Sequence, residues 1–191
     1  MKKFLLTFLM LIASVPLWAY DFEVDGIYYN ILDETAKTVE VTFSGDYYNK
    51  VDDEYTGDVV IPNSVTYGST TFSVTAIGSF AFDGCTGLTS AAIPNSVTAI
   101  GACAFRSCSG LTSVTIPSSV TSIGSGAFDG CYGLTDVNIT DLSAWCKIDF
   151  MYPSSNPLYY TGNLYLNGTL VTNIIIPDGV TSIGAYVFEC Y

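Results

Sequence analysis

The sequence predicts a solenoid, a stack of short coils that share one hydrophobic core. Two observations predict this fold class. The same residues return every 23 positions along the chain, and each 23-residue unit is too short to bury its own apolar side chains. Units of this kind are stable only when they stack on neighbours. The recurring pairs include Ile77-Gly78, Ile100-Gly101 and Ile123-Gly124, and also Ala81-Phe82, Ala104-Phe105 and Ala127-Phe128.

One unit shows how each coil is expected to fold. Between residues 113 and 116, small polar and apolar residues alternate, which is typical of a strand with one buried face. Val114 and Ile116 should point into the core, and Ser113 and Thr115 should point outward. Pro117 lacks a backbone donor and should end the strand. We therefore expect a parallel sheet on the concave face, with short helical turns or extended segments on the convex face.

The six cysteines do not form the pattern of a disulfide framework. Cys85, Cys108 and Cys131 occupy one repeat position, so they should form a column of buried thiols. Cys103 and Cys146 lie outside this column, and their pairing state stays open, as does that of the cysteine at position 190. The chain has no His and no pair of cysteines two residues apart, which disfavours a zinc site.

Two intervals between repeats are longer than 23 residues and indicate insertions. The first lies at about residues 67–75. Its Gly-Ser turn, flanked by aromatic and β-branched residues between Tyr67 and Phe72, predicts a small protruding hairpin. The second lies at about residues 141–172 and is the least repeat-like part of the chain.

The first nineteen residues have the layout of a secretory signal peptide. Lys2 and Lys3 precede a short apolar run and a small-residue exit, with cleavage expected near Ala19. The run is short for a retained membrane helix, which is the rival interpretation. Residues 20–55 should form a β-rich N-terminal cap, and residues 56–191 the repeats. The chain stops within a coil, so Ile183 and Phe188 should be exposed and further repeats are expected.

Charge excludes two classes of partner. Without the leader, four basic residues remain against eighteen acidic ones, so neither nucleic acid nor membrane insertion is expected. The run Asp52-Asp53-Glu54 lacks the ligand spacing and the glycine of an EF-hand loop, and calcium binding is only a weak alternative to simple surface charge. No cofactor is predicted.

The repeat resembles the BspA-like class of leucine-rich repeats. The resemblance rests on Ile-Pro-Ser-Ser-Val-Thr-Ser-Ile-Gly at residues 116–124, followed by Ala127-Phe128, Cys131 and Leu134. It implies a bacterial surface or secreted protein with a role in adhesion, in host-protein binding or in carbohydrate-associated surface functions, and no shared catalytic residues. The usual asparagine position is serine here, and Ser64, Ser96 and Ser119 are expected to bond neighbouring backbone instead.

Binding is expected on the outward-facing side chains of the stacked strands or on the second insertion. Aligning the coils places ten residues on the strand grid: Asp58, Val60, Ser90, Ala92, Ser113, Thr115, Asp136, Asn138, Asn173 and Ile175. The insertion gathers aromatic residues that form either a stacking platform for a sugar or protein, or a cover over the solenoid flank: Trp145, Phe150, Tyr152, Tyr159 and Tyr160.

The function predicted from these features is recognition or adhesion at the cell surface, with a protein or glycan as ligand. The alternative is an architectural cell-envelope spacer without a specific ligand. Enzyme activity is not expected, because the usual general base, His, is absent. A carboxylate-based hydrolase is the weakest reading, since Asp83, Asp129 and Glu189 follow the recurring Phe and are better explained as turn or helix-start residues.

Overall fold

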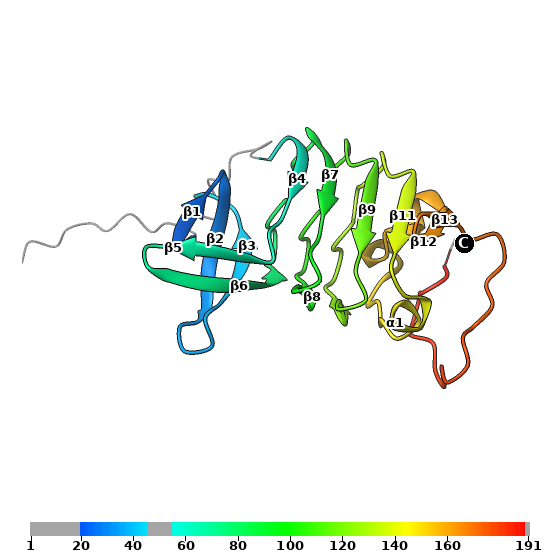
Figure 1. Cartoon of the computed structure of the whole chain (residues 1–191). Helices are drawn as coiled ribbons and strands as arrows, with labels where there is room; N and C mark the ends of the chain where they lie inside the picture. The colour runs from blue at the N-terminus through cyan, green and yellow to red at the C-terminus, as the bar shows by residue number, and fades with distance from the viewer. Residues whose placement is uncertain (1–19, 46–54, 190–191) are drawn as a thin grey trace, which may run out of the picture.

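A computed structural model of the chain describes residues 20–45 and 55–189. The predicted signal peptide, the acidic run at 52–54 and the cysteine at 190 lie outside these residues. Strands stand side by side along the molecule, with a β-rich cap at one end and a partly helical segment near the other (Figure 1).

The cap is an antiparallel meander of β1 (Phe22–Val24), β2 (Ile27–Asp33) and β3 (Thr38–Thr42). The β1–β2 turn uses Asp25 and Gly26, both with positive φ, at 52° and 78°. Such a turn matches the twist of the paired strands, and Asp and Gly are the residues that tolerate it. Alternation along β2 and β3 buries Tyr29, Val39 and Val41 on one side.

The first insertion is a hairpin, as predicted, but it does not protrude. β5 (Ser64–Tyr67) pairs antiparallel with β6 (Thr70–Ile77), and Val65 lies opposite Phe72. Both of these side chains are buried. β6 also pairs in parallel with β3 of the cap and with β8 (Ala99–Ile100) of the repeats. The hairpin therefore joins the cap to the solenoid in one seven-stranded sheet, which β10 (Ser122–Ile123) completes.

A six-stranded sheet carries the repeat register. Its order is β13-β12-β11-β9-β7-β4, and neighbouring strands from β4 to β12 run parallel. The expected orientation is confirmed in β9, where Val114 and Ile116 are buried and Ser113 and Thr115 are partly exposed. The strands are β4 (Gly57–Val60), β7 (Leu88–Ala92), β9 (Ser113–Ile116), β11 (Asp136–Ile139), β12 (Leu164–Leu166) and β13 (Thr169–Leu170).

Between the two sheets, the core is built from columns of identical residues. The rings of Phe82, Phe105 and Phe128 stack nearly parallel, with centroids 4.9 and 5.2 Å apart. Tyr55 extends this stack towards the cap, 4.7 Å from Phe82. The Ala-Phe pairs lie in hydrogen-bonded turns, and these turns also bond to the next coil. For example, the Phe82 amide donates to the Ala104 carbonyl at 2.7 Å.

Neighbouring coils approach so closely at two glycines that no side chain fits. A Cβ on Gly110 would lie 2.1 Å from the Thr86 carbonyl oxygen, and one on Gly133 would lie 2.3 Å from that of Ser109. Both distances are far below van der Waals contact, so the recurring glycine before Leu is a packing requirement of the stack.

The second insertion folds into α1 (Leu142–Cys146), the 3-10 turn η1 (Pro153–Ser155) and α2 (Leu158–Thr161), and then supplies β12. The Asp141 carboxylate caps α1 by accepting from the Ala144 amide at 2.7 Å. Because β12 pairs with β11, the sheet position expected for Asn173 and Ile175 is already taken. That expectation is wrong: both residues are exposed and lie outside the strands.

Residues 171–189 cover the last coil only partly. Ile183 is 49% exposed, as expected, whereas Phe188 is partly buried and packs against the core. Among residues 20–45 and 55–189, no helix has the length and apolar character needed to cross a membrane.

Candidate binding face

The outer face of the six-stranded sheet presents two rows of side chains across the strands. One row runs through Asp58, Ser90, Ser113 and Asp136, which are direct register partners from β4 to β11. Adjacent strands are about 4.8 Å apart, so the row repeats at that interval. The second row lies beside it and consists of Val60, Ala92, Thr115, Asn138 and Tyr165.

A ladder of threonines fixes one end of these strands. The hydroxyl groups of Thr112 and Thr135 each donate to the backbone carbonyl of the threonine one coil earlier, Thr89 and Thr112, both at 3.1 Å. Thr161 continues the ladder by donating to the Thr135 carbonyl. These bonds tie side chains to backbone across coils and hold the strand starts in register, although the hydroxyls lie at the surface.

A second ladder runs along the other sheet, where Thr98 and Thr121 donate to the carbonyls of Thr75 and Thr98. Threonine side chains, rather than the expected serine side chains, therefore bond to the backbone of the neighbouring coil. The hydroxyls of Ser96 and Ser119 are buried without a hydrogen-bond partner, so the serine prediction is wrong for these two residues. The recurrence of Thr every 23 residues was the signal that could have identified the ladders.

Carboxylates at the two sides of the face are held by hydroxyl groups. Asp58 accepts from Thr89 at 2.8 Å and from Ser90 at 2.7 Å, and these bonds lower the pKa of Asp58. On the other side, Asp136 accepts from the Thr135 hydroxyl at 3.2 Å. Hydrogen bonding to Asp136 and its negative charge raise the pKa of Tyr165, because both favour the protonated phenol. Both carboxylates are thereby oriented on the surface.

Tyr165 is the residue of this face that sequence reasoning missed. It lies on β12, in register with Asn138, and is partly exposed. The signal was the alternating Leu164-Tyr165-Leu166 directly before an Asn-Gly pair, a strand followed by a tight turn. The 23-residue period did not place it on the strand grid, because it lies in the second insertion.

Comparison with known proteins identifies the repeat. Residues 58–151 match the BspA type leucine rich repeat region in six copies. The repeat region of this chain belongs to the BspA-type leucine-rich repeat family. Its coils have the parallel sheet and buried Phe and Cys columns described above.

Solved structures with the same fold come from bacteria. A leucine-rich repeat protein from Bacteroides ovatus is 38% identical, with a TM-score of 0.53 over 69% of this chain and 34% of that one. A leucine rich cell surface protein from Faecalibacterium prausnitzii is 26% identical, with a TM-score of 0.52 over 78% of this chain and 43% of that one. This chain therefore spans well under half the length of either protein.

A third solved structure supports the fold alone. The leucine-rich repeat protein from Bacteroides capillosus is 23% identical to this chain, with a TM-score of 0.57 over 76% of this chain and 96% of that one. Among curated proteins, none matches the chain.

The aromatic residues of the insertion do not form one exposed platform on this BspA-type solenoid. Trp145 is only 1% exposed and packs against the equally buried Phe150, so a surface role for Trp145 is wrong. Tyr152 and Tyr159 are exposed. Tyr160 is partly buried, and its hydroxyl accepts from the Gly130 amide at 2.9 Å.

The insertion replaces backbone bonds of the BspA-type stack with side-chain bonds. In regular coils, the amides of Cys103 and Ser107 donate to carbonyls of the next coil. One coil later, the equivalent Gly126 amide donates to the Ser155 hydroxyl at 2.9 Å. The Gly130 amide, which is equivalent to that of Ser107, donates to the Tyr160 hydroxyl. The flank-covering interpretation thus accounts for the contacts of Trp145 and Tyr160.

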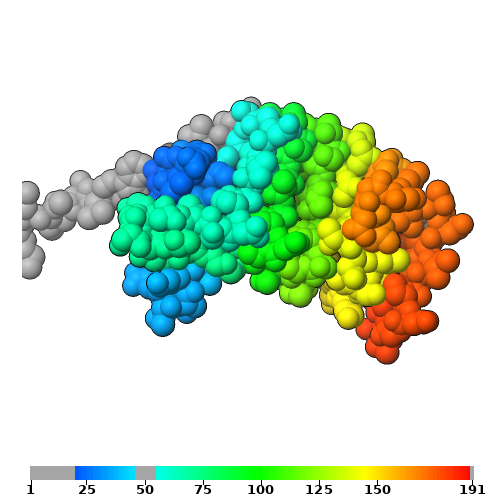
Figure 2. Space-filling model, in the orientation of Figure 1, coloured from blue at the N-terminus to red at the C-terminus, as the bar shows by residue number. Residues whose placement is uncertain are grey.

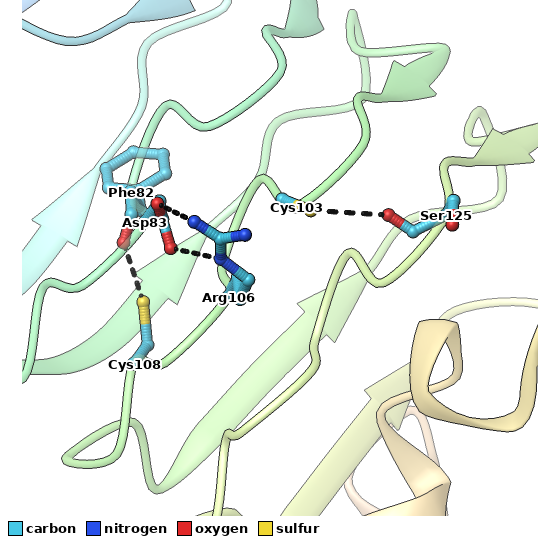
Figure 3. Close-up of polar contacts among 6 residues, drawn as sticks. All are labelled: Phe82, Asp83, Cys103, Arg106, Cys108 and Ser125. Carbon is cyan, nitrogen blue, oxygen red and sulfur yellow. Dashed lines mark hydrogen bonds and ion pairs between the residues drawn. The ribbon is translucent and has the colours of Figure 1, made fainter. Parts of the chain in front are cut away.

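The cysteine column is confirmed, because Cys85, Cys108 and Cys131 are fully buried thiols. The Cys108 Sγ donates to the Phe82 carbonyl at 2.9 Å (Figure 3), and the Cys131 Sγ donates to the Phe105 carbonyl at 3.0 Å. Cys103 and Cys146 are also thiols rather than halves of a disulfide. Burial raises the pKa of Cys131 to about 12, with a smaller contribution from the charge of Asp129.

The carboxylates within the repeat have structural partners. Asp83 forms a bidentate ion pair with Arg106, which Figure 3 shows near Cys108. Asp129 accepts from the Tyr160 hydroxyl at 3.0 Å. These contacts agree with a turn-stabilising role for Asp83 and Asp129. Within residues 20–45 and 55–189, no group of three or more His, Cys, Asp or Glu side chains is arranged to hold a metal ion.

Proposed function

We propose that the protein is a secreted or cell-surface recognition protein of adhesin type, which binds a protein or a glycan through the outer face of its six-stranded sheet. The observation that carries the proposal is the continuous polar row from Asp58 to Asp136, with Tyr165 beside its far end.

The chemistry of this face suits a ligand rich in hydroxyl groups. Ser90, Ser113 and Thr115 supply donors and acceptors with little bulk, and Asn138 adds an amide. The ring of Tyr165 adds an apolar surface at one end, and a sugar or an aromatic side chain can stack on such a ring. Recognition through many small polar contacts and one aromatic contact is consistent with moderate affinity and a repeating ligand.

The location at the cell surface is supported by two independent features. The first nineteen residues have the layout of a signal peptide. The similar protein from Faecalibacterium prausnitzii is described as a cell surface protein. Hydroxyl-rich ligands, on host glycoproteins or on neighbouring cells, are abundant in that setting.

Glycan and protein arrays probed with the purified protein test the proposal. We expect reproducible, saturable binding that Tyr165→Ala and Asn138→Ala weaken. The matched control is Tyr132→Ala, which removes a 78% exposed tyrosine located in a turn away from the sheet. Binding that both sheet variants leave unchanged would move the site elsewhere on the molecule.

An array without any saturable ligand would favour the architectural spacer instead. Catalysis is not part of the proposal, because the repeat carboxylates Asp83 and Asp129 already bond Arg106 and Tyr160. A broad screen of hydrolase substrates is expected to give no turnover, and turnover that depends on either aspartate would contradict this.

A further inference from the structure

A cleft lies between the cap and the first coil, next to the ends of the two rows at Asp58 and Val60. It consists of two adjoining hollows of about 410 and 300 Å³, which share Asp25, Ile27 and Val60 in their walls. The surfaces of β1–β2, in dark blue, and β4, in cyan, meet at this end of the molecule (Figure 2). The remaining walls include Tyr29, Val65 and Asp58.

The walls combine negative charge with apolar surface. Asp25 projects from the cap, and Asp58 belongs to the first repeat strand. Ile27 and Val60 line the same hollow, and Val60 is 72% exposed, unusually high for a large apolar residue on a sheet. A ligand that fills this cleft favourably would therefore carry a positive charge next to an apolar group.

A buried hydroxyl group also belongs to the cleft wall. The side chain of Tyr29 is only 1% exposed and lines the larger hollow. Burial, followed by the negative charge of Asp25, raises the pKa of Tyr29 to about 12.

One wall of the cleft is an open strand edge. β4 is the terminal strand of its sheet and pairs only with β7 among the described strands. The Ile61 amide donates to the Ala92 carbonyl of β7 at 3.1 Å, and the Gly57 amide donates to the carbonyl of Gly87, directly before β7, at 2.8 Å. Because backbone groups of a strand alternate in direction, those of Asp58 and Val60 face away from β7, towards the cleft.

An exposed strand edge is a template for another strand. We propose that the cleft binds an extended cationic peptide segment, which adds to the edge of β4 and places a Lys or Arg side chain between Asp25 and Asp58. Its apolar side chains pack on Val60 and Ile27. The main-chain bonds provide affinity for any extended peptide, and the two carboxylates select the basic one. This site goes beyond the recognition proposed for the sheet face: it shares Asp58 and Val60 with that face but uses the strand edge and Asp25 of the cap.

The test uses a defined probe, the N-acetylated, C-amidated peptide Val-Lys-Val-Lys-Val, with binding to the full chain measured by isothermal titration calorimetry. Three matched peptides accompany it. One is methylated on alternate backbone nitrogens, one carries Glu in place of Lys, and one carries Thr in place of Lys. The first blocks strand pairing without changing charge, and the other two separate charge from shape.

We expect saturable binding of the Lys peptide, weaker binding of the Thr peptide and none of the Glu or methylated peptides. Asp25→Asn should weaken binding of the Lys peptide by about three- to fivefold, the usual size for loss of one partly exposed ion pair. The control Glu34→Gln removes an exposed carboxylate at the β2–β3 turn and should leave the affinity unchanged.

Three results would overturn the proposal. Equal binding of the methylated peptide would exclude strand addition, and an unchanged affinity in Asp25→Asn would exclude the charge contact. Self-association of the protein that blocks the peptide would assign the edge to a second copy of the chain. Tyr165→Ala should bind the peptide normally, so failure here and failure of the sheet-face proposal are distinguishable.

Discussion

The guanidinium group of Arg106 donates two hydrogen bonds to the carboxylate of Asp83, from Nε at 2.8 Å and from Nη2 at 2.7 Å. Arg106 occupies the repeat position that Asp83 holds one coil earlier and Asp129 one coil later. A column of identical acids would repel, so the change of sign at Arg106 turns this position into a bridge between coils. The guanidinium carbon also lies 5.4 Å from the centre of the Phe80 ring.

Replacing Arg106 by Ala should destabilise the fold. The pair is bidentate but partly exposed, so we expect a loss of about 1 kcal/mol in the free energy of unfolding. Urea unfolding followed by circular dichroism measures it, and Arg106→Lys should lose less. The difference in unfolding free energy between wild type and Arg106→Ala should shrink in 1 M salt, because the Debye length is then only about 3 Å and the ion pair is screened. A loss that salt leaves unchanged would indicate packing of the side-chain stem instead.

Replacing Gly110 by Ala should lower the free energy of unfolding more than a substitution of any exposed residue near it. The new Cβ would lie 2.1 Å from the Thr86 carbonyl, so two coils must move apart. Overpacking of this kind costs about 1–3 kcal/mol in the free energy of unfolding. Thermal and urea unfolding measure the change, with the exposed neighbour Ser109→Ala as the control. Equal stability of the two variants would show that the coils can separate freely.

Replacing Tyr160 by Phe removes the acceptor for the Gly130 amide and the donor to Asp129. We expect a loss of about 1–3 kcal/mol in the free energy of unfolding at pH 8, because each of the two hydrogen bonds contributes about 0.5–1.5 kcal/mol. Urea unfolding against Tyr159→Phe, a change in the exposed neighbour, measures it. An equal stability of both variants would mean that water replaces the Tyr160 hydroxyl.

The same residue predicts a pH dependence. Burial, followed by contributions from Asp129, raises the pKa of Tyr160 from 10.0 to about 12. As pH rises, the unfolded chain therefore loses the Tyr160 proton before the folded chain does. The contribution of the protonated Tyr160 hydroxyl to the free energy of unfolding is complete below pH 10 and is lost as pH rises to about 12. The stability of the wild type should fall more steeply over this range than that of Tyr160→Phe, as urea unfolding at stepped pH would record. Parallel curves would contradict the raised pKa of Tyr160.

The thiol of Cys131 should be inert in the folded protein. Its pKa is raised to about 12 by burial, and iodoacetamide reacts with the thiolate rather than the thiol. At pH 8, mass spectrometry should find Cys131 unmodified until urea unfolds the chain. Cys103, which is partly exposed, serves as the internal comparison and should react first. Labelling of both thiols at one rate would mean that the column opens locally.

Local repetition made the coil interior predictable. The inward positions of Val114 and Ile116 and the columns headed by Phe82 and Cys85 follow from residues that recur at one interval. The hairpin at Tyr67 was also recognisable, because a turn pattern is local. Its place between the cap and the repeats was not, since β6 pairs with β3 through residues far apart in the sequence, such as Val39 with Val74.

The candidate binding face was predictable up to β11. Asp58, Ser90, Ser113 and Asp136 share one repeat position, so their alignment in a row follows from the period. Beyond β11 the period is broken, and the prediction failed at Asn173 and at Trp145. An aromatic residue in an irregular segment can equally fill the core or face solvent, and composition does not distinguish these outcomes.

By itself, the sequence determined the period of the stack, the buried columns and the orientation of each repeat strand, because these depend on contacts between equivalent residues of adjacent coils. Only the tertiary structure decided that β12 rather than residues 173–176 continues the sheet, and that Ser155 and Tyr160 replace backbone acceptors. It also decided that Asp25 of the cap lines one hollow together with residues of β4. Such choices depend on which distant segment satisfies exposed backbone groups at a given place, and no local pattern encodes that geometry.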